Sequence, residues 1–148
     1  MTRMWARFRR DQRGAALLEV AMTLPIMLLV SVGIFEFGRA YQTWQILTNA
    51  AREGARIAVL PGTDDATVTS RVQTYMSDGQ LSNPAGSSIV VTRNNTIAIG
   101  IGTATASRVT INYPFTFMVL QPVAQLVSSS STMGTPLTMT ASALMRNE

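Results

Sequence analysis

Residues 14–35 read GAALLEVAMTLPIMLLVSVGIF, an apolar run that contains one charged residue, Glu19. As an α-helix, residues 15–35 would extend ~31 Å at a rise of about 1.5 Å per residue, and the hydrocarbon core of a bilayer is about 30 Å thick. Five arginines precede the run, whereas only Glu36 and Arg39 follow it closely. Because positive charge is retained in the cytoplasm, we expect one spanning helix with a cytoplasmic N-terminus and the later residues outside.

A cleaved secretory signal would also combine basic residues with an apolar run. This run is long for such a signal, Glu19 lies inside it, and no Ala-x-Ala pair follows at the right distance. We therefore expect residues 15–35 to stay in the protein as a membrane anchor.

The composition argues against an enzyme. The 148 residues include 12 arginines, 8 acidic residues, no cysteine and no histidine. Disulfides, thiol nucleophiles, the commonest metal ligands and the usual general base at neutral pH are therefore absent, and we expect no catalytic, cofactor-binding or metal site. The net charge of +4 comes from the basic leader, residues 1–14. Membrane topology explains this charge, so we expect no nucleic-acid partner.

Residues 36–61 predict an amphipathic continuation of the anchor helix that ends at Pro61-Gly62. Small residues recur there at Ala50, Gly54 and Ala58, four residues apart, so that another backbone could approach closely. That backbone could belong to another chain or to this chain's own sheet, and the spacing leaves both readings open. The apolar positions expected to form one buried face are Phe37, Tyr41, Trp44, Leu47, Ala51, Gly54 or Ala55, and Ala58.

Residues 62–148 predict a small α+β domain, in which the helix packs on an antiparallel sheet. A second helix is expected over residues 63–79, capped by Thr63 or Asp64 rather than binding calcium through Asp64 and Asp65. Alternation then predicts strands around residues 89–91, 97–101, 109–113 and 137–145, with a tight turn at Asn94-Asn95 and a break at Pro114.

Residues 115–127 are apolar but too short and too interrupted to span a bilayer. We expect a buried loop between strands, or else an apolar surface for a partner subunit. The serine-rich residues 128–132 are expected to be a polar linker.

A basic leader, then Gly14, then an apolar segment whose fifth residue is Glu19 resembles the processing signature of type IV prepilins and pseudopilins. The resemblance implies that a prepilin peptidase cuts after Gly14 and leaves Ala15 as the new N-terminus. It also implies that the Glu19 carboxylate pairs with the N-terminal amine of a neighbouring subunit. Such pairing would relieve the desolvation cost that each charge carries in hydrocarbon.

Two further motifs are EFGR at 36–39 and NAAREGAR at 49–56. Together with the leader and Pro25, they make the chain similar to the TadE-like family. The resemblance covers about residues 9 to 60 strongly and the C-terminal residues 144–148 weakly. It implies a pilin-like minor subunit in biogenesis of a Tad/Flp (tight-adherence) type IV pilus, with the anchor in the bacterial inner membrane and residues 62–148 in the periplasm. Implied partners are other pilin-like subunits, the prepilin peptidase, inner-membrane lipid and the pilus assembly platform.

The alternative is a single-pass envelope protein that is never processed and that acts as a scaffold or binding module of a secretion complex. Its N-terminal sequence in membranes would still begin near Met1.

Overall fold

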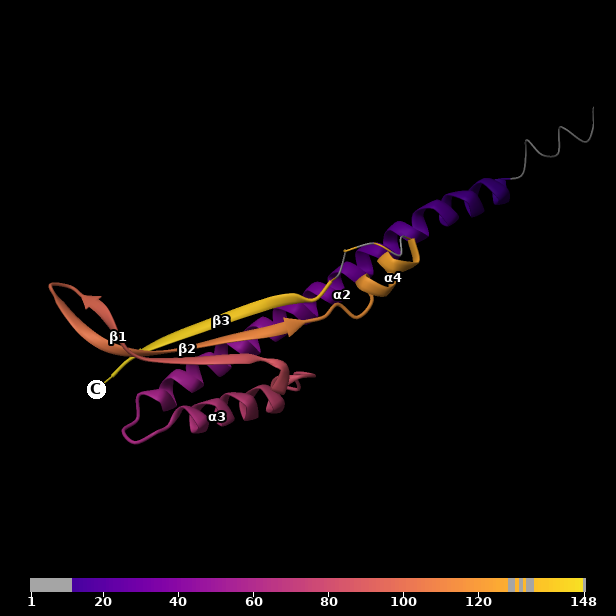
Figure 1. The fold of residues 1–148 in the computed structure, drawn as a ribbon. Coiled ribbons are helices and arrows are strands. Elements are labelled where there is room, and N and C mark those ends of the chain that lie inside the picture. Colours follow the sequence, from indigo (N-terminus) through magenta and orange to yellow (C-terminus); the bar gives the residue numbers. More distant parts are fainter. Residues whose placement is uncertain (1–11, 128–129, 131, 133–134, 148) are drawn as a thin grey trace, which may run out of the picture.

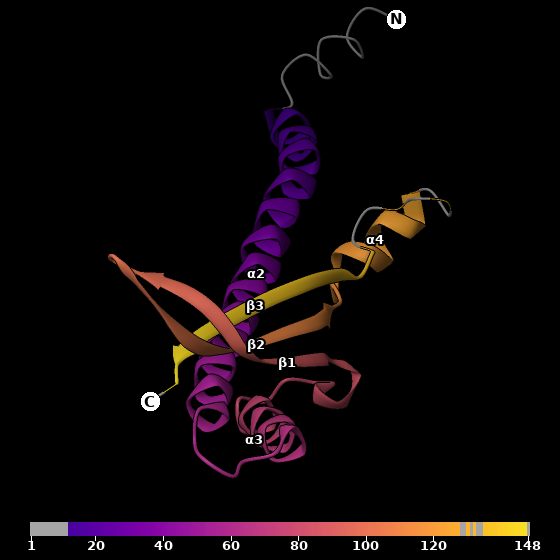
Figure 2. The same ribbon diagram turned by 60° about the vertical axis from the view of Figure 1, so that its left-hand side comes forward.

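The computed structural model describes the chain except for residues 1–11, 128–129, 131, 133–134 and 148. Most of the predicted leader and part of the predicted 128–132 linker therefore lie outside the described residues. A long helix lies across one three-stranded antiparallel sheet and a shorter helix (Figures 1 and 2). The predicted α+β class and the packing of a long N-terminal helix on a small antiparallel sheet are confirmed.

The first described element, α2, is one continuous helix, Gln12–Ala58. Pro25 lies inside it, and its N-terminal half projects away from the rest of the molecule (Figure 1). This half is apolar and exposed: its most hydrophobic window has a mean hydropathy of 2.2 and none of that window is buried. Such a helix is long and apolar enough to span a bilayer, which fits a single-pass membrane protein.

The C-terminal half of α2 packs against the sheet and against α3, Asp65–Asp78. The hydrophobic side chains there that have no exposed surface are small or aliphatic: Leu47, Ala50, Ala51 and Ala55. Asp64 caps α3 by accepting a hydrogen bond from the Thr67 N–H at 2.9 Å, as one of the two predicted caps would. Arg71 of α3 donates to Glu53 of α2 at 3.0 Å, so an ion pair also links the two helices.

The predicted buried face of α2 is wrong at its first three positions. Phe37, Tyr41 and Trp44 are 77%, 63% and 47% exposed. Glu36 and Thr43 are buried instead, on an adjacent face of the helix. Helical periodicity detects an apolar stripe, but it does not distinguish a stripe that faces the sheet from one that faces away.

The sheet has three strands in the order β1-β2-β3, with bounds Ser88–Ile99, Gly102–Phe115 and Leu137–Arg146. The predicted turn at Asn94-Asn95 is wrong, because β1 runs through it and the chain reverses at Gly100-Ile101. Thr92 pairs with Arg108 and Asn95 with Ala106, so two residues of β1 oppose the single residue Ser107. This is a β-bulge, and the positive φ of 58° at Asn94 belongs to it.

The bulge gives Arg93 a structural role. Its guanidinium donates to the Ala58 carbonyl at 2.7 Å, to the Thr63 carbonyl at 2.8 Å and to the Asp65 carboxylate at 2.8 Å. Ala58 is the last residue of α2, where a carbonyl has no partner within the helix and a cation is favoured. Arg93 thereby ties β1 to the end of α2 and the start of α3.

The chain beyond β2 differs from the expected buried loop. Pro114 does not break β2, because it pairs with Thr138 of β3. Pairing between β2 and β1 ends at Asn112, so no β1 strand lies beside Pro114 on its other side. After β2 the chain forms a short helix, α4, Leu120–Val127. A single turn of 3-10 helix, η1, Pro84–Gly86, lies earlier in the chain, before β1. In both ribbon views α4 lies off the end of the sheet, on the side of the N-terminal half of α2 (Figures 1 and 2).

Candidate functional site

The three residues implied in processing and assembly lie on the exposed apolar half of α2. Gly14, Ala15 and Glu19 are all exposed. A Cβ added at Gly14 would find nothing within 4 Å. The Thr23 hydroxyl donates to the Glu19 backbone carbonyl at 2.9 Å, but within the described part of the chain no hydrogen bond or ion pair reaches the Glu19 carboxylate. Among the described residues, this carboxylate is therefore unpaired.

Ala50, Gly54 and Ala58 are buried inside the chain itself. A Cβ added at Gly54 would lie 2.5 Å from Val72 Cγ2 of α3 and 3.2 Å from Val109 Cγ1 of β2. A distance of 2.5 Å is a steric clash, so α2 approaches α3 and β2 this closely only because residue 54 is glycine. Of the two approaching backbones that the sequence leaves open, this chain's own sheet and second helix occupy the site.

A site that the sequence does not predict lies where the apolar half of α2 meets the sheet domain. Glu36 is 2% exposed although it directly follows the apolar run. Its Oε1 accepts a hydrogen bond from the Val119 backbone N–H at 2.5 Å, and its Oε2 accepts one from Arg39 Nη1 at 2.9 Å. Val119 immediately precedes α4, so Glu36 binds the N-terminus of that helix from 83 residues away in sequence.

Burial by itself would raise the pKa of the Glu36 carboxyl. The backbone N–H groups of Val119, Leu120 and Met118, followed by the positive charge of Arg39, outweigh this effect and hold the pKa below its ordinary value of 4.5. Glu36 is therefore ionised at neutral pH. An anion at this place also suits the positive end of the α4 dipole.

Aromatic side chains complete the environment of the ion pair. The Arg39 guanidinium lies over the Phe115 ring at 5.3 Å from its centroid, and Phe117 packs edge-on against Phe115 at 5.2 Å. These contacts hold Arg39 in position beside Glu36. We call Glu36, Arg39, Phe115 and Val119 the membrane-proximal junction.

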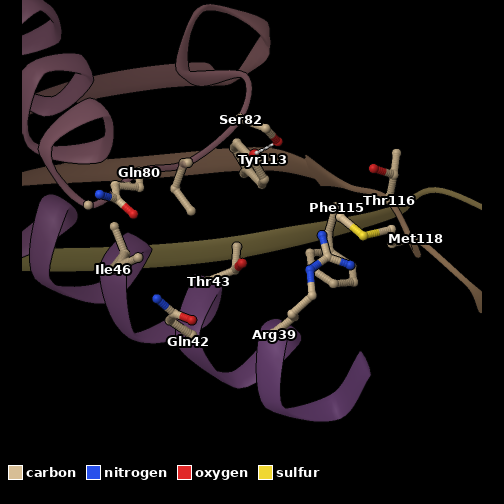
Figure 3. Close-up of a pocket in the computed structure, with 12 residues that line it drawn as sticks. Arg39, Gln42, Thr43, Ile46, Gln80, Ser82, Tyr113, Phe115, Thr116 and Met118 are labelled. Atoms are coloured by element: carbon tan, nitrogen blue, oxygen red, sulfur yellow. Dashed lines mark hydrogen bonds between the residues drawn. The ribbon is translucent and has the colours of Figure 1, made fainter. Parts of the chain in front are cut away.

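The junction borders a cleft of about 240 Å³ between α2, the segment after α3 and the end of β2 (Figure 3). At its far end the hydroxyls of Ser82 and Tyr113 lie 3.4 Å apart. Its charged lining group is Arg39, and the remaining polar groups are hydroxyls and amides. These groups include no carboxylate or imidazole that could act as a general base. The labelled lining residues are Arg39, Gln42, Thr43, Ile46, Gln80, Ser82, Tyr113, Phe115, Thr116 and Met118.

Acidic groups elsewhere in the described residues are also dispersed. Within that part of the chain, no group of three or more Asp or Glu side chains is placed to hold a metal ion. The buried side-chain nitrogen and oxygen atoms described there all have hydrogen-bond partners.

Comparison with known proteins agrees with the N-terminal motifs. The family profile described as TadE-like protein matches residues 14–56, which are almost the whole of α2. No curated protein matches the chain, and no solved structure matches it. The matched range contains Gly14, Glu19, Glu36 and Gly54. The N-terminal helix of this chain is therefore similar to the TadE-like family, and the resemblance predicted from the sequence is confirmed over residues 14–56.

Proposed function

We propose that the chain is a minor, pilin-like subunit of a Tad/Flp pilus system with a structural role in pilus biogenesis. The TadE-like match supports an association with the Tad pilus in general. In this proposal the anchor lies in the bacterial inner membrane, the leader is cytoplasmic and the sheet domain is periplasmic. A prepilin peptidase cuts between Gly14 and Ala15, and the assembly platform then brings the subunit together with other pilin-like subunits.

One observation carries this proposal: Glu19 lies on an exposed apolar helix five residues after Gly14, and no side chain in the described part of the chain pairs with its carboxylate. An acid in a bilayer costs several kcal/mol unless it is paired or lies near the surface. A newly exposed amine at Ala15 of a neighbouring subunit would supply the missing charge. The same helix, α2, continues into the sheet domain without a break. Pairing at Glu19 would therefore also fix the position of the sheet domain relative to the neighbouring subunit.

The mass of the mature protein tests the processing step. Membranes from cells that contain a prepilin peptidase should yield a chain that begins at Ala15, and cells that lack the peptidase should yield the full-length chain. Gly14→Ile should remain full length in both. Gly33→Ile, which alters a glycine inside the same apolar run, serves as the matched control and should be cut normally.

A full-length chain in peptidase-containing membranes would instead support the unprocessed envelope protein. In that case the sheet domain would act as a scaffold or binding module of a secretion complex, and Glu19 would be an acid tolerated near the cytoplasmic surface of the bilayer.

A further inference from the structure

The membrane-proximal junction fixes the position of α4 relative to the membrane anchor. Glu36 is the first residue after the apolar run of residues 14–35, and its carboxylate binds the Val119 N–H at the start of α4. The first turn of α4 is therefore attached at the point where α2 leaves the bilayer. From there α4 extends on the side of the N-terminal half of α2 (Figures 1 and 2).

The sequence of this region suits contact with lipid. Arg108 and Arg146 have no charged residue between them, although this segment contains half of β2, α4 and most of β3. Within α4, the residues other than Gln121 and Gln125 are apolar, and these two glutamines share one helix face because they are four residues apart. Met118 is 61% exposed beside the start of the helix, and Phe37 is 77% exposed on the same turn of α2 as Glu36.

The identity of the surface that covers this apolar region follows from the anchor. A helix attached at the end of a membrane-spanning segment meets the outer leaflet of that same bilayer at very high effective concentration. Amphipathic helices of this kind lie in the boundary between headgroups and acyl chains, with the apolar face toward the chains. A second protein chain would have to compete with lipid that is always present.

We propose that α4 is an interfacial membrane helix that lies in the outer leaflet around α2, with Met118 in contact with acyl chains and the Gln121–Gln125 face toward the headgroups. The uncharged segment implies that apolar burial drives this contact and that anionic lipid is not needed. Glu36 is then a positioning residue, since it sets where α4 meets the bilayer. The inference rests on the membrane anchoring within the proposed function, but not on processing or on the pilus.

Depth-dependent quenching in phosphatidylcholine vesicles tests the proposal on the full chain. The protein contains no cysteine, so Met118→Cys can carry a single fluorescent label. Met145→Cys is the matched control, because Met145 is an exposed methionine at the opposite end of β3. Leu24→Cys reports on the anchor itself. We expect a spin-labelled lipid to quench the label at 118 at least threefold more than the label at 145, and aqueous iodide to show the reverse order.

Two further measurements complete the test. Quenching of the label at 118 by lipid and by iodide should not change at high salt. Glu36→Ala should reduce the difference in lipid quenching between the labels at 118 and 145. Equal iodide quenching at 118 and 145, with the label at 24 still quenched by lipid, would overturn the proposal while leaving the anchor intact. Shielding at 118 that disappears when the protein is diluted in lipid would also overturn it, since a second copy would then be the cover. If the label at 24 is not quenched by lipid, the anchoring itself fails.

Discussion

At the scale of single residues, we expect substitution of Glu36 to reduce the stability of the folded chain most. Glu36→Ala removes the acceptor for the Val119 N–H and the partner of Arg39 in a nearly water-free site. Losing one member of a buried, charge-assisted set costs about 2–4 kcal/mol. We expect the free energy of unfolding in detergent to fall by this amount, and the Val119 amide to lose protection in hydrogen exchange. An Ala variant that unfolds like the parent would show that the junction contributes nothing to stability.

The charge on Glu36 also predicts a pH dependence. Its pKa is lower in the folded chain than the ordinary value of 4.5, so the charged carboxylate contributes stability that is fully present above about pH 4.5. That contribution is lost as the pH falls through the lower, folded pKa. Glu36→Gln keeps an acceptor oxygen but has no charge. The stability difference between the parent and Glu36→Gln should therefore shrink in urea titrations below pH 4.5, and a difference that stays constant with pH would contradict the assignment.

The Glu36 site shows what sequence reasoning reaches at this scale. The spacing of Glu36 and Arg39 predicts an i,i+3 ion pair, and that pair is present at 2.9 Å. The partner at Val119 could not be predicted, because 83 residues separate the two and nothing in the intervening sequence marks the contact. The sequence signal for this site is a charged residue, Glu36, directly after an apolar run. That signal does not show that Glu36 is buried, and its burial is what gives it a structural role.

At the scale of elements, Gly54 sets how closely α2 approaches α3 and β2. Gly54→Ala would place a Cβ 2.5 Å from Val72, and relieving such a clash costs about 1–3 kcal/mol. Gly38→Ala is the matched control on the same helix, because a Cβ there meets nothing within 4 Å. It should raise stability by about 0.5–1 kcal/mol through helix propensity. Urea unfolding followed by circular dichroism separates these opposite signs, and two variants with the same sign would contradict the packing argument.

Arg93 should matter because it joins three elements at one point. Arg93→Met removes hydrogen bonds to Ala58, Thr63 and Asp65 in a partly exposed site, so we expect a loss of about 1–2 kcal/mol. Arg93→Lys should recover less than half of that loss, since one ammonium does not reproduce the planar fork. Arg108→Met, at an exposed arginine of β2, should change the urea midpoint little. Equal effects at positions 93 and 108 would remove the role given to Arg93.

Elements were predicted well where local signals determine them. The helix that begins after Asp64 is one example: the cap depends on short-range chemistry, and the structure confirms Asp64 as the capping residue. The Asn94-Asn95 pair was misread as a turn, because asparagine with positive φ suits a bulge as well as a turn. Only the pairing with β2 separates these two outcomes, and that pairing is not visible in the local sequence.

At the scale of the whole molecule, the sequence shows where α2 is long and apolar enough to span a bilayer, but it does not show what each face of α2 contacts. The anchor is a property of composition over 22 consecutive residues, 14–35, and such signals need no tertiary information. The spacing predicts that Phe37, Tyr41 and Trp44 face the core, but all three are exposed in the structure. Part of the apolar surface of α2 is exposed and part is packed on the sheet, and the apolar pattern alone does not show where one ends and the other begins.

We expect the N-terminal half of α2 to act in assembly and not in the stability of the fold, and the Glu19→Val variant tests this expectation. No described side chain pairs with the Glu19 carboxylate, so Glu19→Val should leave the free energy of unfolding in detergent within about 0.5 kcal/mol and should not impair membrane insertion. If this carboxylate meets the amine of a neighbouring subunit, the variant should be recovered with other pilin-like subunits at less than a tenth of the parent's yield in crosslinking from intact membranes. Leu24→Val, which changes an exposed residue of the same run without altering charge, is the control and should crosslink normally. Normal crosslinking of Glu19→Val would assign the acid to the membrane surface alone and remove the pairing from the assembly mechanism.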